Sequence, residues 1–165
     1  MATKSKAAET RVRRAVRADA AQLPELCRQL GYPSTEAEVL GRFERVEASP
    51  EHALFVAEDA GGRIVGFVDV FVLRTIESEP RVEIAGLVVD EKHRSCGVGE
   101  LLMERTEAWA KEHGCGVVSL RSNVLREGAH RFYERLGYKC VKTQKAFRKE
   151  LRGETEKRKA SPLKR

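Results

Sequence analysis

The chain has 165 residues, of which 41% are hydrophobic and 34% are charged. This length suits one domain with its own apolar core, and this balance is typical of a globular protein in water. No apolar run approaches the roughly 20 residues that a membrane-spanning helix needs, and the basic N-terminal segment is not followed by the apolar stretch of a secretory signal. We therefore expect no membrane association and a cytoplasmic location.

The formal net charge of +6 is concentrated near the C-terminus. Residues 142–165 contain ten Lys or Arg and three Glu, a net of +7, which leaves the rest of the chain at about −1. We expect one domain at residues 11–151, a disordered N-terminal segment at residues 1–10 and a disordered basic tail at residues 152–165. Because the tail has few aromatic side chains for stacking on bases, nucleic acid is not an expected partner.

The four cysteines are scattered and form no CxxC pair; they are Cys27, Cys96, Cys115 and Cys140. No histidine stands near them at the spacing of zinc ligands. We therefore expect neither a disulfide framework nor a metal site.

Hydrophobic periodicity predicts an alternation of strands and helices, beginning with a strand at residues 11–16. Apolar positions at helical spacing then predict a helix over residues 20–30, closed by Gly31, and a second helix from Pro33-Ser34 to about Val46. Residues 53–58 and 64–73 read as two antiparallel strands, because the polar, glycine-containing run between them is a hairpin signal.

The second half continues with a strand at residues 82–89 and a helix that opens at Gly97 and Gly99 and ends near His113-Gly114. Its expected buried stripe consists of Val98, Leu101, Leu102, Ala108 and Trp109. A strand at 116–120, a helix at 127–136 and strands at 138–141 and 144–149 follow. The whole is a mixed α/β (α+β) fold with about seven strands, mostly antiparallel, and helices on both faces of the sheet.

The segment Arg94-Ser95-Cys96-Gly97-Val98-Gly99 lies directly after an apolar strand and directly before an amphipathic helix. A helix start presents unpaired N–H groups and a partial positive charge, and glycines let an anion approach the backbone. The pattern therefore predicts a pyrophosphate site, with Arg94 adding charge-assisted hydrogen bonds. A tight strand-to-helix turn is the alternative interpretation of the same glycines.

Two further motifs follow one another along the chain. The first is EIAGLVVD at residues 83–90 followed by RSCGVGELLM at 94–103, and the second, after Asn123, is AHRFYERLGY at 129–138. Together and in this order they resemble the GNAT superfamily of N-acetyltransferases. The resemblance implies a GNAT-like sheet with a splayed pair of parallel strands and acetyl-CoA as co-substrate. Residues 122–133 are similar to the bacterial branch that includes aminoglycoside and aminoalkylphosphonate N-acetyltransferases.

The resemblance also assigns the residues that hold the cofactor. The backbone of residues 87–89 would pair with the pantetheine arm, and residues 94–101 would wrap the pyrophosphate. Asn123 either touches the cofactor or is simply a polar residue after a strand end. The expected cofactor-binding residues are Leu87, Val88, Val89, Arg94, Ser95, Cys96, Gly97, Val98, Gly99, Glu100, Leu101, Asn123 and Tyr133.

An acetyltransferase that acts on amines needs a base, because only about one alkyl ammonium in 2,500 is neutral at pH 7. Glu83 is the best candidate: a carboxylate inside an apolar strand is costly unless it is used, and it aligns with a family position that often serves as general base. The alternatives are that Glu83 pairs with Arg81 or another cation, and that Glu77 or Glu79 is the base.

The departing thiolate needs a proton, and the resemblance makes Tyr133 the expected donor. Ala129, Phe132, Tyr133 and Leu136 also form a stripe at helical spacing, so a packing role is the alternative. The expected partners are acetyl-CoA and an amine acceptor, either a small molecule or a protein amine, and a homodimer is a candidate assembly because relatives often pair. A noncatalytic acyl-CoA-binding module is the competing function.

Overall fold

The computed structural model describes residues 9–151. The expected disorder of residues 1–8 and of the basic tail at 152–165 therefore lies outside the described residues. The chain divides into two compact units, the first ending at Arg126 and the second beginning at Glu127.

The first unit contains all the strands of the described chain. The strands are β1 (Arg11–Arg14), β2 (His52–Glu58), β3 (Ile64–Thr75), β4 (Ser78–Val89) and β5 (Val118–Leu120), and the helices are η1 (Arg17–Gln22), α2 (Leu23–Leu30), α3 (Glu36–Glu47), η2 (Glu91–His93) and α4 (Val98–Glu112). The predicted helix over 20–30 is thus a 3-10 turn followed by an α-helix that has Pro24 in its first turn. The second helix begins later than predicted, at Glu36, because Thr35 and Glu38 form a capping box there.

The five strands form one mixed sheet in the order β1-β2-β3-β4-β5. The first four pair antiparallel and β4 pairs parallel with β5. The predicted mostly antiparallel sheet with one parallel pair is therefore confirmed. The prediction of about seven strands is wrong for the described residues, since residues 138–141 and 144–149 form no strand. Residues 138–149 carry five Lys or Arg, and a strand forms only where a neighbouring strand pairs with it.

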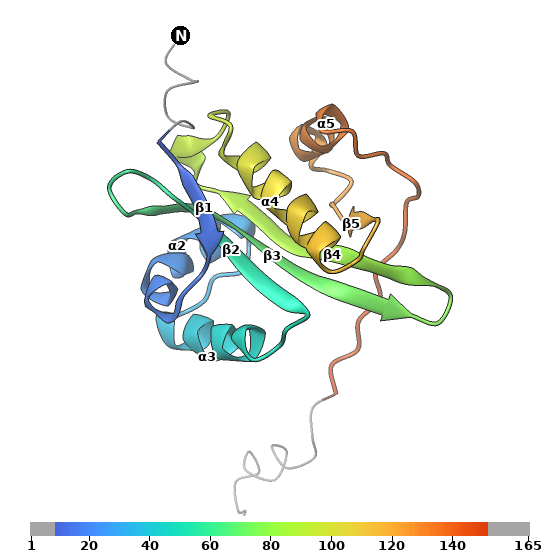
Figure 1. The fold of residues 1–165 in the computed structure, drawn as a ribbon, viewed down its shortest axis with the longest axis horizontal. Coiled ribbons are helices and arrows are strands. Elements are labelled where there is room, and N and C mark those ends of the chain that lie inside the picture. Colours follow the sequence, from blue (N-terminus) through green and yellow to red (C-terminus); the bar gives the residue numbers. More distant parts are fainter. Residues whose placement is uncertain (1–8, 152–165) are drawn as a thin grey trace, which may run out of the picture. The chain divides into compact units, whose positions relative to one another are not determined.

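Helices cover both faces of the sheet (Figure 1): α2 and α3 lie on one face and α4 on the other. Side chains alternate between the two faces along a strand. On β2, Val56 joins the core cluster with Leu26 of α2 and Phe43 of α3, whereas Phe55 packs edge-on against Trp109 of α4, with ring centroids 6.4 Å apart. The sheet therefore has an α2/α3 face and an α4 face.

The buried face of α4 differs in part from the predicted stripe. Val98, Leu102 and Trp109 are at most 2% exposed, as expected, but Leu101 is half-buried and Ala108 is exposed. The face is completed by Met103, Thr106 and Ala110. The hydroxyl of Thr106 donates a hydrogen bond to the carbonyl of Leu102 within the helix, so the buried hydroxyl has a hydrogen-bond partner.

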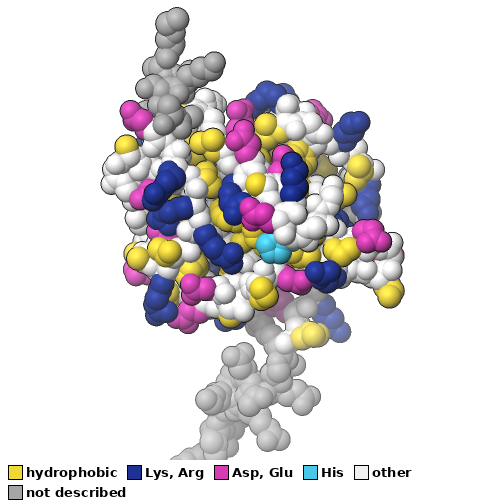
Figure 2. Space-filling model, viewed as in Figure 1, with side chains coloured by type: hydrophobic (Ala, Val, Ile, Leu, Met, Phe, Trp, Pro, Cys, Tyr) yellow, Lys and Arg dark blue, Asp and Glu magenta, His cyan; other side chains and the backbone are white. Residues whose placement is uncertain are grey.

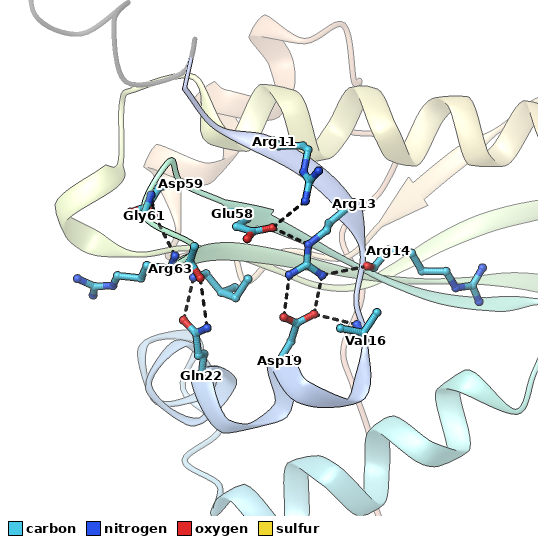
Figure 3. Close-up of polar contacts among 12 residues, drawn as sticks. Arg11, Arg13, Arg14, Val16, Asp19, Gln22, Glu58, Asp59, Gly61 and Arg63 are labelled. Carbon is cyan, nitrogen blue, oxygen red and sulfur yellow. Dashed lines mark hydrogen bonds and ion pairs between the residues drawn. The ribbon is translucent and has the colours of Figure 1, made fainter.

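An ion-pair network ties β1 and η1 to β2 (Figure 3). Arg13 lies between two carboxylates: its terminal nitrogens bind both oxygens of Asp19 at 2.7 and 2.8 Å, and its Nε binds Glu58 at 2.6 Å. Asp19 is only 5% exposed and also accepts the backbone N–H of Val16. Burial raises the pKa of Asp19, but the Arg13 and Val16 hydrogen bonds outweigh it and hold the pKa below its ordinary value.

The second unit contains α5 (Glu127–Arg135). The helix is followed by Gly137, whose φ of 89° is the left-handed conformation that favours glycine after a helix end. The N–H of Tyr138 then returns to the carbonyl of Tyr133 at 3.0 Å. The helix predicted for residues 127–136 is therefore confirmed.

Candidate active site

Strand β4 extends beyond the end of its parallel partner, β5. The pairing with β5 covers Val82–Val118, Glu83–Ser119 and Ile84–Leu120, whereas β4 continues to Val89 along β3. A β-bulge interrupts the β3–β4 register at this point, and the extra residue, Ala85, is exposed. A parallel pair that stops while one strand continues fits the splayed pair that the GNAT resemblance implies.

Beyond the bulge, the backbone groups of β4 alternate between its two edges. The N–H of Asp90 donates to Val65 of β3 at 2.9 Å, so residues 86, 88 and 90 direct their backbone groups toward β3. Leu87 and Val89 therefore direct theirs to the opposite edge, the one that β5 occupies further back. The carbonyl of Val89 accepts a hydrogen bond from Arg94 Nε at 3.2 Å.

The loop after β4 is sharply turned. The 3-10 turn η2 leads to Ser95, whose φ is 60°, and to Gly97, whose φ is 85°. Both angles lie in the left-handed region, which is costly for a residue with a Cβ such as serine and which glycine adopts freely. Strained backbone of this kind is frequent at ligand-binding sites.

Gly97 is the N-cap of α4, and within the described residues no side chain caps this helix start. The first N–H groups of α4 are consequently left without partners in the helix itself. Of the predicted phosphate-binding residues, Arg94 and Ser95 are exposed, Val98 is buried beneath the turn, and the others are half-buried: Cys96, Gly97, Gly99, Glu100 and Leu101. The structure therefore brings these residues together around one helix start.

Glu83 is buried on β4, with 7% of its surface exposed. Ser119 Oγ donates a hydrogen bond to its Oε2 at 2.5 Å, and Arg121 Nε lies 3.4 Å from its Oε1. Arg81 Nε is 4.0 Å from Oε2. Pairing with cations was the alternative interpretation of this glutamate, and these contacts are present. They hold the carboxylate in place, and its role as the general base stays a prediction.

The alternative bases lie far along the strand from Glu83. Glu77 and Glu79 are exposed at the β3–β4 hairpin, where Thr75 pairs with Ser78. Four residues of strand separate Glu79 from Glu83, which is roughly 13 Å. They do not share the surroundings of Glu83.

A row of side chains crosses the sheet next to Glu83, and the sequence analysis did not find it. His52, Phe71, Glu83 and Ser119 are successive register partners on β2, β3, β4 and β5, and direct partners share a face. The rings of His52 and Phe71 are 5.8 Å apart, and His52 Nε2 lies 2.6 Å from Asp69 Oδ1. The sequence feature that could have indicated this row is Asp69, which is a carboxylate inside an apolar strand, as Glu83 is.

The segment after β5 returns to the end of α2. Arg126 donates to the carbonyl of Leu30 at 3.3 Å. Asn123 accepts the N–H of Leu125 through its side-chain oxygen at 2.9 Å, which is a local turn. This contact fits the interpretation of Asn123 as a polar residue after a strand end, while a cofactor contact stays a prediction.

Tyr133 belongs to the second unit, where its ring contacts Phe132 at 5.2 Å and Tyr138 at 6.1 Å between centroids. These contacts lie within α5 and the turn after it, and no residue of α5 is fully buried, so the packing role of the stripe also stays a prediction. The proposed proton transfer by Tyr133 stays a prediction.

Asp90 is a buried carboxylate that the sequence analysis did not single out. It is 3% exposed and is bound by Gln29, His93 and Arg63. Burial raises its pKa, but the hydrogen bonds from Gln29 and His93 and the charge of Arg63 outweigh it, so that the pKa lies below its ordinary value. His93 is half-buried. The signal was an Asp and a His three residues apart, directly before Arg94.

A cavity of about 560 Å³ lies beside α2. Its lining comes from η1, α2, the residues after α2 and the β2–β3 hairpin, and it includes Asp90. Because neither Glu83 nor any of residues 91–97 lines it, we do not place the chemistry in this cavity.

The model of the acetyltransferase (GNAT) family matches residues 18–138. The chain belongs to this family. It is an N-acetyltransferase that uses acetyl-CoA as co-substrate, as the two sequence motifs predict. Within residues 9–151, no His, Cys, Asp or Glu side chains are grouped so as to hold a metal ion, and no helix has the length and apolar character needed to cross a membrane.

The chain is similar in sequence to two curated N-acetyltransferases. It is 29% identical over 144 residues to an aminoglycoside N(6′)-acetyltransferase type 1 of Stenotrophomonas maltophilia, a match that covers 85% of this chain and 93% of the relative. It is 36% identical over 98 residues to an uncharacterised N-acetyltransferase of Methanocaldococcus jannaschii, covering 58% of this chain and 43% of that protein.

Solved structures show the same fold at lower identity. The aminoglycoside N-acetyltransferase AAC(6′)-Iy in complex with CoA aligns with a TM-score of 0.76 at 20% identity, covering 86% of this chain and 95% of that one. Glucosamine-6-phosphate N-acetyltransferase from Arabidopsis thaliana aligns with a TM-score of 0.75 at 23% identity, covering 86% and 99%. The mixed sheet with its parallel β4–β5 pair is thus the GNAT fold.

Proposed function

We propose that this chain transfers the acetyl group of acetyl-CoA directly to a primary amine of a small polar molecule. The observation that carries the proposal is the course of β4. The strand passes a buried carboxylate at Glu83, leaves its partner β5 at Ile84, and leads at Val89 into the strained loop and the uncapped start of α4. A base, an extended backbone edge and an anion site therefore follow one another along one strand.

The backbone edge at Leu87 and Val89 is assigned to the pantetheine arm. Pantetheine contains amides, and an extended strand edge binds amides as it would bind a further strand. The N–H of Val89 stands where a thioester carbonyl at the end of that arm would be polarised. The pyrophosphate is assigned to residues 94–101, because the N–H groups and the dipole of a helix start favour a bound anion. Arg94 supplies the positive charge.

Glu83 is assigned as the general base, acting directly or through a water molecule. Ser119 and Arg121 fix the orientation of its carboxylate, and a base must be held in one orientation to be efficient. The amine nitrogen attacks the thioester carbon, its proton passes to Glu83, and the carbon–sulfur bond then breaks. Tyr133 is assigned as the acid that protonates the departing thiolate.

The acceptor is assigned to the α2/α3 face of the sheet next to Glu83. Glu83 is the register partner of Phe71, and Asp69 lies two residues before Phe71 on β3, so all three share this face. Two carboxylates and an aromatic ring favour a compound with more than one ammonium group. The similarity to an aminoglycoside N(6′)-acetyltransferase supports the same class. A protein amine is the second candidate, since the family model that matches residues 18–138 names no acceptor.

The face shown in Figure 2 interleaves Lys and Arg with Asp and Glu over the described residues, so it presents no continuous basic surface. A nucleic acid would need such a surface for its phosphates.

The test is an acceptor panel. Purified protein is incubated with acetyl-CoA and with aminoglycosides, aminoalkylphosphonates, polyamines or lysine peptides, and the products are identified by mass spectrometry. We expect acetylation of a small compound with several amines. Asp69→Asn should raise the KM for such an acceptor several-fold more than the KM for a simple monoamine. Acetylation of peptides alone would contradict the small-molecule assignment.

A further inference from the structure

Asp90, at the end of β4, has a partner on each of its carboxylate oxygens although the proposed chemistry does not use it. Its Oδ1 accepts a hydrogen bond from Gln29 Nε2 at 3.0 Å, and its Oδ2 lies 2.8 Å from His93 Nδ1. The backbone N–H of His93 also donates to the carbonyl of Asp90 at 2.8 Å. Asp90 therefore closes the turn that leads directly into Arg94, with both its side chain and its backbone.

Gln29 makes a second bond at the same junction. Its Oε1 accepts the backbone N–H of Glu91 at 3.0 Å, while its Nε2 donates to Asp90 and to Glu25. One side chain of α2 thus holds two consecutive residues at the start of the loop. A neutral amide is the side-chain group that donates and accepts at once, which explains a glutamine at this position.

The end of α2 also touches the strand of the proposed site. A Cβ built on Gly86 would lie 3.1 Å from Leu30 Cδ2, so a larger residue in β4 would press on α2 there. Leu30 also accepts the hydrogen bond from Arg126. The helix that we expect to shape the acceptor site is therefore fixed both to β4 and to the loop that follows it.

We propose that Gln29 and Asp90 are positioning residues, whose bridge through Glu91 and His93 holds the loop of residues 94–99 to α2 and so presets it for the pyrophosphate of acetyl-CoA. The inference rests on the proposed function, because it takes this loop to be the pyrophosphate site.

Gln22 offers a matched control. It lies seven residues earlier, where it also bridges to backbone: Ile64 N–H donates to its Oε1 at 3.0 Å, and its Nε2 donates to Gly62 at 3.4 Å. These bonds hold the β2–β3 hairpin (Figure 3) and not the loop before α4. Gln22→Leu therefore removes two bonds to the hairpin, whereas Gln29→Leu removes two bonds to the start of the loop together with the bond to Glu25.

The experiment compares hydrogen exchange of the cofactor-free proteins with steady-state kinetics. Gln29→Leu should speed exchange of the amides at 91–99 and raise the KM for acetyl-CoA, each roughly ten-fold for the loss of two hydrogen bonds, with kcat changed less than about two-fold. Gln22→Leu should speed exchange at 62–64 and leave the KM for acetyl-CoA unchanged. Equal exchange at 91–99 in the two variants would overturn the inference, as would a kcat loss without a change in KM.

A second variant guards against misfolding of the first. Gln29→Glu keeps an acceptor for the Glu91 N–H but places a carboxylate against Asp90, so it should also loosen the loop. The exchange measurement does not require acetyl-CoA. If Gln29→Leu loosens the loop but acetyl-CoA binds neither the variant nor the unaltered protein, the proposed function is wrong, while the bridge from Gln29 to Asp90 does hold the loop.

Discussion

Ser119 of β5 donates a hydrogen bond to Glu83 of β4, and the two residues are direct partners in the parallel register. The bond fixes the carboxylate at the last stretch of paired backbone before β4 leaves β5. This position is where a base must stand if the amine attacks a thioester held along the remainder of β4. The same bond would also suit a purely structural role for Glu83, so kinetics must distinguish the two roles.

Glu83→Gln should lower kcat/KM about 100-fold and remove the fall in rate on the acidic side of the pH–rate profile, because an amide cannot accept the proton. The measurement is the pH dependence of thiol release at low acceptor concentration. The control is Glu79→Gln, an exposed glutamate on the same strand, which should leave the profile unchanged. A normal profile in Glu83→Gln together with an altered one in Glu79→Gln would assign the base to the hairpin.

Tyr133→Phe should reduce turnover by roughly 100-fold, because the thiolate loses its proton donor, and should leave acetyl-CoA affinity nearly unchanged. Single-turnover rates and calorimetric titration measure the two quantities separately. Tyr138→Phe is the control, since its ring packs against that of Tyr133 in the same unit. Equal turnover in the unaltered protein and in Tyr133→Phe would leave the tyrosine with its packing role alone.

Gly97→Ala should weaken acetyl-CoA binding more than it weakens folding. Gly97 at the start of α4 and Gly114 after its end both have positive φ, at 85° and 68°, so an alanine costs about 1–2 kcal/mol of folding stability at either position. Only Gly97 adjoins the proposed pyrophosphate site. Chemical denaturation and acetyl-CoA titration of Gly97→Ala and Gly114→Ala test this directly, and an equal loss of affinity in both would contradict the assignment.

Asp19→Asn should destabilise the protein by roughly 2–4 kcal/mol at pH 7, because it leaves the charge of Arg13 without its buried partner. Since the folded-state pKa of Asp19 is lowered, the stabilisation is fully present above the unfolded-state pKa and is lost as the pH falls through the folded-state pKa. The difference between variant and unaltered protein should therefore shrink below about pH 4. Urea unfolding from pH 3 to 7 measures it.

The control for the Arg13–Asp19 pair is Glu51→Gln. The Glu51–Arg74 pair is exposed, with 44% and 58% of the two side chains accessible, so its loss should lower stability far less than Asp19→Asn does, at any pH. If both variants lost the same stability, the Arg13 network would have no special role.

Elements with strong periodicity could be predicted from the sequence, as could those with a clear stop signal. Gly31 does end α2, with φ 100°, and the hairpin signal at 59–63 does join β2 to β3. The strands expected beyond Tyr138 could not be predicted reliably, because short alternating segments acquire a strand structure only from a partner. Ala108 was misplaced because several faces of α4 carry small or apolar residues, and only packing selects among them.

In the candidate site, too, local features could be predicted and features that depend on distant parts of the chain could not. Local motifs located the loop at Arg94–Gly99, because a helix start and its glycines adjoin in sequence. The row from His52 to Ser119 could not be found in this way, since its members come from four strands and only the register aligns them. The bridge from Gln29 to Asp90 joins residues 61 positions apart, and no local pattern marks such a pair.

The most direct test of the central claim is the initial rate of thiol release from acetyl-CoA with a small compound bearing several amines, compared with a lysine peptide and with no acceptor. We predict saturable thiol release with the small compound, equal in amount to the acetylated product. A protein whose melting temperature rises with acetyl-CoA, but which releases no more thiol with any small amine than without one, would contradict the claim.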